Sequence, residues 1–276
     1  MTSLAINPEI VSFFGLSIRW YAVIMVSGAF LATILSNREG QRKGLPKDFF
    51  TDLVYYLFPV GILGARIYYV VFKFEDYQHD LLRIFYIWEG GLAIYGGLLA
   101  GIVFLYWYAK KFNIPTFILL DIITPGVLLA QAIGRWGNFV NQEAYGAPVT
   151  RAYLEQLHLP NFIIEQMNVN GQYYQPTFLY ESVLSVIGFV LLMVLRRKLK
   201  GLKIGDTTLF YVIWYGIERF FVEGMRSDSL WLGPLRVSQA LSLVLVVLSI
   251  CMYVYRHRKD VSLYEMYQYE NQLGSV

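Results

Sequence analysis

A stripe of polar and ionisable side chains interrupts one of the apolar segments of this sequence. Its members are spaced by four, four and three positions: Tyr215, Arg219, Glu223 and Arg226. On a helix this spacing places all of them on one face. An ionised group at mid-membrane costs at least about 2.5 to 3.5 kcal/mol, so such groups normally face a cavity and mark a functional site. The structural alternative is an ion pair between Arg219 and Glu223 that only hides two charges, or side chains that snorkel to the membrane interface.

A second polar block, GRWGNFVNQEAYG, occupies residues 134–146. It supplies a cation, two amides and a carboxylate within a short stretch: Arg135, Asn138, Asn141 and Glu143. Its glycines allow the backbone to turn tightly, and its amides both donate and accept hydrogen bonds. As a bare pattern the block fits either a binding site or a turn that caps a helix.

Polar residues from several apolar segments fall at one depth when the segments are counted as helices. At a rise of about 1.5 Å per residue, the following residues reach the outer half of a bilayer or its edge: Tyr21, Arg66, Arg135, Glu181 and Arg219. Guanidinium groups bind phosphate through planar, paired hydrogen bonds that a lysine does not reproduce. The cluster therefore indicates a site for the phosphate of an anionic lipid at the outer leaflet.

The composition places these residues in a membrane protein. Of the 276 residues, 56% are hydrophobic and only 16% are charged, too few polar groups to cover a water-soluble domain. A bilayer core of roughly 30 Å needs about 20 helical residues. Seven apolar runs approach that length, at residues 18–36, 51–72, 91–107, 117–136, 176–195, 207–222 and 234–255. The predicted fold is a single membrane domain, residues 1–276, of the all-α integral membrane class with about seven transmembrane helices.

Charges alternate along the connections between these runs. Basic clusters follow the first, third, fifth and seventh runs, whereas the intervening connections carry mainly acidic residues. The positive-inside rule therefore predicts an N-terminus outside and a C-terminus in the cytoplasm, where the polar residues 260–276 are expected to form a flexible tail. The net charge is only +3, and the basic residues form short clusters rather than one face, so nucleic acid is not expected as a partner.

The one long polar connection on the outside is predicted to form a small extracytoplasmic cap, residues 137–175, between spans four and five. Strand-like runs at residues 161–169 and 172–174 flank Asn170 and Gly171. Asn-Gly between such runs is a strong signal for a short β-hairpin. A disordered loop is the alternative for this segment.

The block at residues 134–146 resembles the pattern G-R-x-G-N-F-x-N-x-E-x-x-G of the prolipoprotein diacylglyceryl transferase family and matches every fixed position. Other family blocks occur in the same order along the chain: RWY at 19–21, GAR at 64–66, WEGGLAIYGG at 88–97, QPTFLYE at 175–181 and the stripe at 215–226. The resemblance extends over about residues 5–258. Agreement over so many ordered blocks is not expected by chance.

The resemblance implies a bacterial enzyme of the cytoplasmic membrane, with seven spans and an outward-facing site that opens to membrane lipid. Such an enzyme transfers the diacylglyceryl group of phosphatidylglycerol to the lipobox cysteine in the signal peptide of a prelipoprotein. The product is a thioether, and glycerol 1-phosphate leaves, in the first step of bacterial lipoprotein maturation. No cofactor and no metal is expected.

The resemblance also assigns functional positions to individual residues. Arg135 and Arg219 match the family's essential arginines, and the other matched positions are Tyr21, Asn138, Glu143, Gly146 and Glu223. Many members have a histidine where this chain has Tyr95. A tyrosine, with a reference pKa near 10, would need a strong cationic neighbour to act as a base at neutral pH.

In the predicted mechanism, Arg135 and Arg219 hold the phosphate and stabilise charge on the departing group. Glu143 or Glu223 orients an arginine or takes the thiol proton, and Tyr95 hydrogen-bonds the thiolate or the glycerol hydroxyls; the assignment among these roles stays open. The remaining candidates for binding substrate are Arg66, Asn141, Tyr215 and Arg226.

The main alternative is a multi-pass transporter of an anionic solute, which also places arginines in a cavity. It predicts polar groups through both leaflets, whereas the cytoplasmic halves of the first, fifth and seventh spans are almost wholly apolar. Another alternative, an enzyme acting on a lipid-linked sugar, calls for metal-binding aspartates. The nearest candidates, Asp121 and Asp206, lie toward the cytoplasmic side.

Overall fold

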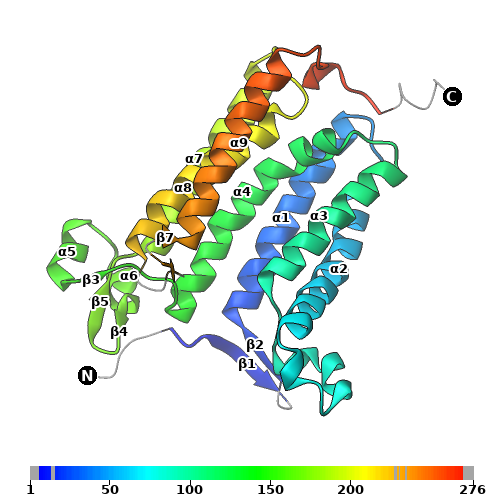
Figure 1. Cartoon of the computed structure of the whole chain (residues 1–276). Coiled ribbons are helices and arrows are strands. Elements are labelled where there is room, and N and C mark those ends of the chain that lie inside the picture. The colour runs from blue at the N-terminus through cyan, green and yellow to red at the C-terminus, as the bar shows by residue number, and fades with distance from the viewer. Residues whose placement is uncertain (1–5, 14–15, 227–228, 230, 234, 270–276) are drawn as a thin grey trace. The chain divides into compact units, whose positions relative to one another are not determined.

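The computed structural model describes residues 6–13, 16–226, 229, 231–233 and 235–269, and most of them are helical (Figure 1). The backbone packs into two compact units. Unit one comprises Met1–Leu35 and Asp121–Met266, and unit two comprises Ser36–Leu120 and Tyr267–Val276. Helices α1 (Trp20–Arg42) and α4 (Thr116–Asn141) contribute residues to both units.

Seven helices of at least 18 residues occur in the described part of the chain, and each overlaps one of the predicted spans. They are α1, α2 (Phe49–Phe72), α3 (Ile94–Lys111), α4, α7 (Thr177–Lys198), α8 (Asp206–Met225) and α9 (Val237–His257). Among the described residues, five helices are long and apolar enough to cross a membrane: α1, α2, α4, α7 and α9. Helix α3 ends on Lys110 and Lys111, and α8 carries the charged stripe, which lowers their mean hydropathy. The chain is thus a membrane protein with five candidate spans, and the count of seven remains a prediction.

Unit one contains α7, α8 and α9, which run side by side (Figure 1). Small residues let these helices approach closely. A Cβ atom on Gly188 would collide with the Trp214 ring, and one on Gly216 would lie 2.6 Å from Val246 Cγ2. The Trp214 indole also donates to the Leu184 carbonyl at 3.0 Å. Close packing of this kind, with interhelical hydrogen bonds, is what holds helices together in lipid.

The cap, residues 137–175 of unit one, is folded. It contains α5 (Arg151–Gln156), α6 (Asn161–Gln166) and an antiparallel sheet in the order β3 (Pro148–Val149), β5 (Gln172–Tyr174), β4 (Asn168–Val169). The predicted hairpin is confirmed, because β4 and β5 are joined by Asn170 and Gly171. Their φ angles of 53° and 87° fit a type I′ turn. The alternative of a disordered loop is therefore wrong.

The predicted strand over residues 161–169 is wrong in its first part, since residues 161–166 form α6. This helix begins directly after Pro160 and buries Ile163 and Ile164 in the core of the cap, together with Leu154 and Phe178. Adjacent residues of a strand point to opposite faces. A helix is therefore the conformation that buries both isoleucines against one core.

Two further hairpins correct the expectation of an all-α fold. β1 (Glu9–Phe13) pairs with β2 (Leu16–Arg19) before α1, and β6 (Trp231–Leu232) pairs with β7 (Leu235–Arg236) between α8 and α9. As a result, α1 starts at Trp20 rather than at residue 18, and α9 starts at Val237 rather than at residue 234. The fold is mostly helical, with small sheets in the connections.

Unit two contains α2 and α3, which pack against each other through glycines. A Cβ atom on Gly64 would lie 2.7 Å from the Gly96 carbonyl oxygen. The described chain between these helices, loop 73–93, forms the short 3-10 helices η1 (Phe74–Asp76), η2 (Leu81–Phe85) and η3 (Ile87–Glu89). At the end of the loop, the Ala93 amide donates to the Ala65 carbonyl at 3.0 Å, which returns the chain to α2.

The segment predicted as a flexible tail, residues 260–276, makes defined contacts in its described part. The Ile204 amide donates to the Ser262 carbonyl at 3.0 Å, and the Tyr264 amide donates to the Leu202 carbonyl at 2.8 Å. Tyr264 is buried and begins the short helix η4 (Tyr264–Met266). These contacts attach the tail to the loop before α8. Residues 270–276 lie outside the described residues, and the division into one membrane domain, a cap and a tail stays a prediction.

Candidate active site

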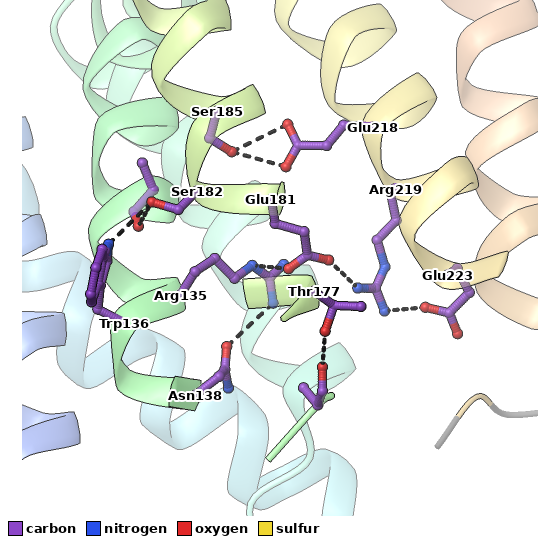
Figure 2. A network of polar contacts seen from close by, with 12 residues as sticks. Arg135, Trp136, Asn138, Thr177, Glu181, Ser182, Ser185, Glu218, Arg219 and Glu223 are labelled. Atoms are coloured by element: carbon purple, nitrogen blue, oxygen red, sulfur yellow. Dashed lines mark hydrogen bonds and ion pairs between the residues drawn. The ribbon is translucent and has the colours of Figure 1, made fainter. Parts of the chain in front are cut away.

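One carboxylate joins two arginines from different helices of unit one. Glu181 of α7 forms an ion pair with Arg135 of α4 through Oε2 and Nε, and another with Arg219 of α8 through Oε1 and Nη1 at 3.2 Å (Figure 2). Glu181 is only 3% exposed. The structure therefore brings together the two arginines that the sequence places at one depth.

A second buried carboxylate completes this arginine network, which consists of Arg135, Glu181, Arg219 and Glu223. Glu223 Oε2 lies 2.6 Å from Arg219 Nη2, and Glu223 is 2% exposed. The intrahelical ion pair that was the structural alternative thus exists, but Arg219 also contacts Glu181 on the neighbouring helix. The attraction between the two positive and the two negative side chains of this network offsets the free-energy cost of removing them from water. The arginine side chains are 18% and 19% exposed, so part of each remains accessible.

Hydrogen bonds between α4 and α7 hold the backbone that carries Arg135 and Glu181. The Trp136 indole donates to Ser182 Oγ at 3.2 Å, and the Ser182 hydroxyl donates to the Ala132 carbonyl at 2.9 Å (Figure 2). Trp136 and Ser182 are each the direct chain neighbour of an ionic residue. Their bonds therefore fix the two helices at the position of the ion pair.

The polar block at residues 134–146 lies at the end of α4, and its side chains form a hydrogen-bonded chain. Arg135 Nη1 donates to Asn138 Oδ1 at 3.4 Å, and Asn138 Nδ2 donates to Glu143 Oε1 at 2.8 Å. Asn141 Nδ2 lies 3.5 Å from the same oxygen. The Glu143 side chain is exposed. The block thus ends a helix and also supplies side chains that connect to the arginine network.

Tyr21 and Gly146 both lie where a side chain packs closely against a glycine. The Tyr21 ring lies against Gly137, where a Cβ atom would come within 2.7 Å of Tyr21 Cδ2. The Gly146 amide donates to the Gln175 carbonyl at 3.0 Å, and a Cβ atom there would lie 2.8 Å from Gln175 Cβ. Gly146 also forms a β-bridge with Arg226, which ties the cap to the end of α8.

Tyr215 continues the stripe toward the start of α8. It stacks on Tyr211, with ring centroids 6.0 Å apart and an interplanar angle of 8°. Gln131 of α4 donates to the Tyr211 hydroxyl at 3.1 Å. In this direction the stripe of α8 therefore consists of aromatic rings rather than of charges.

Arg66 belongs to unit two, where the backbone of loop 73–93 engages its guanidinium. Its nitrogens donate at 2.6 to 3.0 Å to four carbonyl oxygens, those of Arg83, Ile84, Gly90 and Gly91. Arg66 is buried and also lies over the Tyr77 ring. Four of the five N–H donors of the side chain are used in this way. The donors that substrate binding requires are thus occupied, and the geometry favours a role for Arg66 in holding the loop.

Tyr95, the candidate base or hydrogen-bond donor, also belongs to unit two. It lies in the first turn of α3, beside the glycine that packs on α2, and is 46% exposed. The other predicted catalytic residues lie in unit one: Arg135, Glu143, Arg219 and Glu223.

Glu181 is the member of the network to which the sequence assigns no role. Two observations point toward it, namely its depth near the outer end of a span and its place at the end of the QPTFLYE block. Neither reveals that one carboxylate contacts two arginines. That contact joins three helices that are distant in the sequence.

Asp121 caps the start of α8. Its Oδ2 accepts from the Gly205 amide at 2.6 Å, and its Oδ1 accepts from the amide and the hydroxyl of Thr208 at 2.8 and 2.6 Å. Asp206 contacts the Lys203 amide at 2.8 Å. These bonds occupy both oxygens of Asp121, which gives this residue a structural role at the start of α8.

The chain is similar to known proteins over nearly its whole length. The family model for prolipoprotein diacylglyceryl transferase matches residues 8–255. The phosphatidylglycerol–prolipoprotein diacylglyceryl transferase of Lactobacillus acidophilus is 49% identical over 259 residues, which cover 94% of this chain and 92% of that protein. Proteins of the same name from Ligilactobacillus salivarius and Enterococcus faecalis are each 51% identical, over 92% of this chain and 95% and 91% of their own lengths.

Proposed function

Because the chain belongs to the prolipoprotein diacylglyceryl transferase family, we propose that it transfers a diacylglyceryl group from phosphatidylglycerol to a prolipoprotein. It is a membrane transferase of lipoprotein maturation. The observation that carries the proposal is the pair Arg135 and Arg219, joined by Glu181. Two partly accessible guanidinium groups, held together in a buried polar network, are suited to an anionic phosphate.

The proposed reaction replaces a carbon–oxygen bond by a carbon–sulfur bond. The acceptor is the lipobox cysteine of the signal peptide, whose sulfur attacks the glyceryl carbon that bears the phosphate. The thiol proton passes to a base, the carbon–oxygen bond breaks with its electron pair on the phosphate oxygen, and glycerol 1-phosphate leaves. Negative charge grows on the phosphate as this bond breaks. Hydrogen bonds from Arg135 and Arg219 therefore stabilise the transition state more than the ground state.

The two glutamates of the predicted catalytic set take different roles. Glu223 is buried in its ion pair with Arg219, which supports a role in orienting the arginine. Glu143 is exposed and is held by Asn138 and Asn141, which supports it as the base that accepts the thiol proton.

The remaining predicted residues are proposed to act on the lipid or on the thiol. Tyr95 hydrogen-bonds the thiolate or the glycerol hydroxyls. The residues proposed to contact the lipid or to shape its site are Tyr21, Asn138, Asn141, Gly146, Tyr215 and Arg226. Arg66 is proposed to act indirectly, by holding loop 73–93 through its hydrogen bonds rather than by contacting the lipid.

We also propose seven spans in the bacterial cytoplasmic membrane, with the N-terminus outside and the C-terminus in the cytoplasm. The alternation of basic and acidic connections supports this orientation, which puts the cap and the arginine network near the outer leaflet. Helix α8 has a low hydropathy for a span because of its charged stripe. Arg219 of this stripe is paired with Glu181 and Glu223, so its charge is compensated within the protein, which is compatible with a helix that crosses the membrane. The alternative of an anionic-solute transporter is not favoured by the family.

The test is to incubate the purified full-length protein with phosphatidylglycerol vesicles and a synthetic lipobox peptide. The expected result is a peptide mass increased by one diacylglyceryl group, together with release of glycerol phosphate. A peptide with alanine in place of the lipobox cysteine must remain unmodified. An unchanged mass of the cysteine peptide in the presence of folded protein would reject the proposed reaction.

A further inference from the structure

We propose that Glu181 is a positioning residue that fixes the spacing of Arg135 and Arg219, so that their remaining N–H donors converge on one phosphate. This inference rests on the proposed function. Glu181 itself does not touch the substrate in this scheme. It acts through the two arginines, each of which it binds directly.

Each oxygen of Glu181 contacts a different arginine, and each arginine keeps donors to spare. A guanidinium group carries five N–H donors on three nitrogens. Arg135 uses Nε for Glu181 and Nη1 for Asn138. Arg219 uses Nη1 for Glu181 and Nη2 for Glu223. The Arg135 and Arg219 side chains are 18% and 19% exposed, so donors of both guanidinium groups remain for a ligand.

A phosphodiester is suited to the donors that remain. It presents two non-bridging oxygens, much as a carboxylate presents two oxygens, and both groups accept paired N–H bonds from guanidinium. Arg135 and Arg219 already bind the two oxygens of one planar acceptor, the Glu181 carboxylate. The separation that fits this carboxylate is therefore suited to a second two-oxygen acceptor as well.

Two guanidinium ions do not stay this close without a counter-charge. Like charges repel in proportion to 1/(εr), and the effective dielectric constant of a buried site is well below that of water. Glu181 is buried between Arg135 and Arg219, so it replaces their repulsion by two attractive contacts (Figure 2). In Glu181→Gln only one oxygen remains as an acceptor, and the amide NH2 faces the other guanidinium. The arginines then separate.

The charge balance predicts which kinetic constant responds. Arg135 and Arg219 balance Glu181 and Glu223, so these four residues together carry no net charge before the lipid binds. Glu181→Gln makes the same group net positive, which attracts an anionic headgroup at least as well as before. What the variant loses is the alignment of donors, which acts mainly in the transition state. The rate of the bound complex therefore falls, while KM for phosphatidylglycerol does not rise.

The experiment compares purified full-length variants in vesicles of phosphatidylglycerol with the lipobox peptide. Glu181→Gln is expected to lower kcat at least about tenfold without raising KM for phosphatidylglycerol more than about twofold. Glu181→Asp keeps the charge but is one methylene shorter, so it is expected to retain part of the rate.

Glu218→Gln is the matched control. Glu218 is buried like Glu181 and lies on α8, but its carboxylate accepts from the Ser185 hydroxyl at 3.0 Å and forms no ion pair in the described part of the chain (Figure 2). The glutamine keeps an acceptor for Ser185. The kcat of Glu218→Gln is expected to stay within about twofold of wild type.

Thermal unfolding of each variant separates positioning from a purely structural role. The positioning role is rejected if Glu181→Gln melts early but turns over at the wild-type rate below its melting temperature, or if Glu218→Gln loses as much kcat. Should Glu181→Gln fail to fold, Glu181→Asp decides: a wild-type kcat rejects the role, and a reduced kcat at unchanged KM supports it. Failure of the wild-type protein to modify the peptide rejects the proposed function itself, whereas normal wild-type turnover with an unaffected Glu181→Gln rate rejects only the role of Glu181.

Discussion

Arg219 Nη2 lies 2.6 Å from Glu223 Oε2, one turn further along α8, and the other terminal nitrogen of Arg219 lies 3.2 Å from Glu181 on α7. With both terminal nitrogens bonded to carboxylates, the plane of the guanidinium is held in one orientation. A lysine ammonium is a compact point charge without such a plane. It cannot keep both carboxylate contacts and also reach a phosphate from the same position.

Arg135→Lys and Arg219→Lys are therefore each expected to lower kcat/KM for peptide lipidation by at least about a hundredfold, although both retain the positive charge. Initial rates of peptide mass conversion measure this loss. Arg151→Lys is the control, because Arg151 is exposed in the cap and is paired there with Glu155 and Glu165. It is expected to keep the wild-type rate. Full activity of either Arg135→Lys or Arg219→Lys would reject a phosphate site built on paired hydrogen bonds.

Arg66→Ala is expected to lower the melting temperature of the purified protein by at least about 5 °C, since it leaves carbonyl oxygens of loop 73–93 without donors. The melting temperature of Arg66→Lys is expected to lie between those of the wild type and Arg66→Ala, because an ammonium offers fewer donors in a different geometry. Arg83→Ala serves as the control: its side chain is half exposed and pairs with Glu89 at the surface, so little change in melting temperature is expected. Equal shifts for Arg66→Ala and Arg83→Ala would contradict the role assigned to Arg66.

Depth along a helix can be counted from the sequence, whereas the partner of a side chain cannot. Arg135 and Arg219 were predictable as neighbours because helices rise by a constant amount per residue, about 1.5 Å. The same count places Arg66 at the depth of the two arginines and predicts that it binds substrate, although its guanidinium donates to carbonyl oxygens of loop 73–93. Glu181 gains its role only when α4, α7 and α8 are packed together. No local pattern encodes that arrangement.

The cap shows the same limit on a smaller scale. The turn at Asn170 and Gly171 was predictable because it depends on the backbone preferences of two adjacent residues. The conformation of residues 161–166 was not, because Ile163 and Ile164 favour strands locally while their burial in the cap core requires a helix. The burial of both isoleucines by tertiary packing therefore outweighs their local preference for a strand.

Asp121→Ala is expected to destabilise the protein by about 2 kcal/mol, because three donors at the start of α8 lose their acceptor. Asp121→Asn retains one acceptor oxygen and is expected to have a smaller effect. The measurement is chemical or thermal unfolding, with Asp52→Ala, an exposed residue in the first turn of α2, as the control. Because Asp121 caps a helix and contacts no member of the arginine network in the described structure, lipidation per folded molecule is expected to stay unchanged. A selective loss of activity at wild-type stability would show instead that Asp121 takes part in the reaction.

Tyr264→Ala is expected to destabilise the packing of the tail by about 3 kcal/mol, because a buried aromatic ring is removed and a cavity is left. Hydrogen exchange reports this locally. The Tyr264 and Ile204 amides, which donate to Leu202 and Ser262, are expected to exchange slowly in the wild type and quickly in the variant. Met266→Ala is the matched control, since Met266 belongs to the same short helix but is 69% exposed. Rapid exchange of the Tyr264 amide in the wild-type protein would mean that the polar composition of residues 260–276 was the better guide and that this segment is a flexible tail after all.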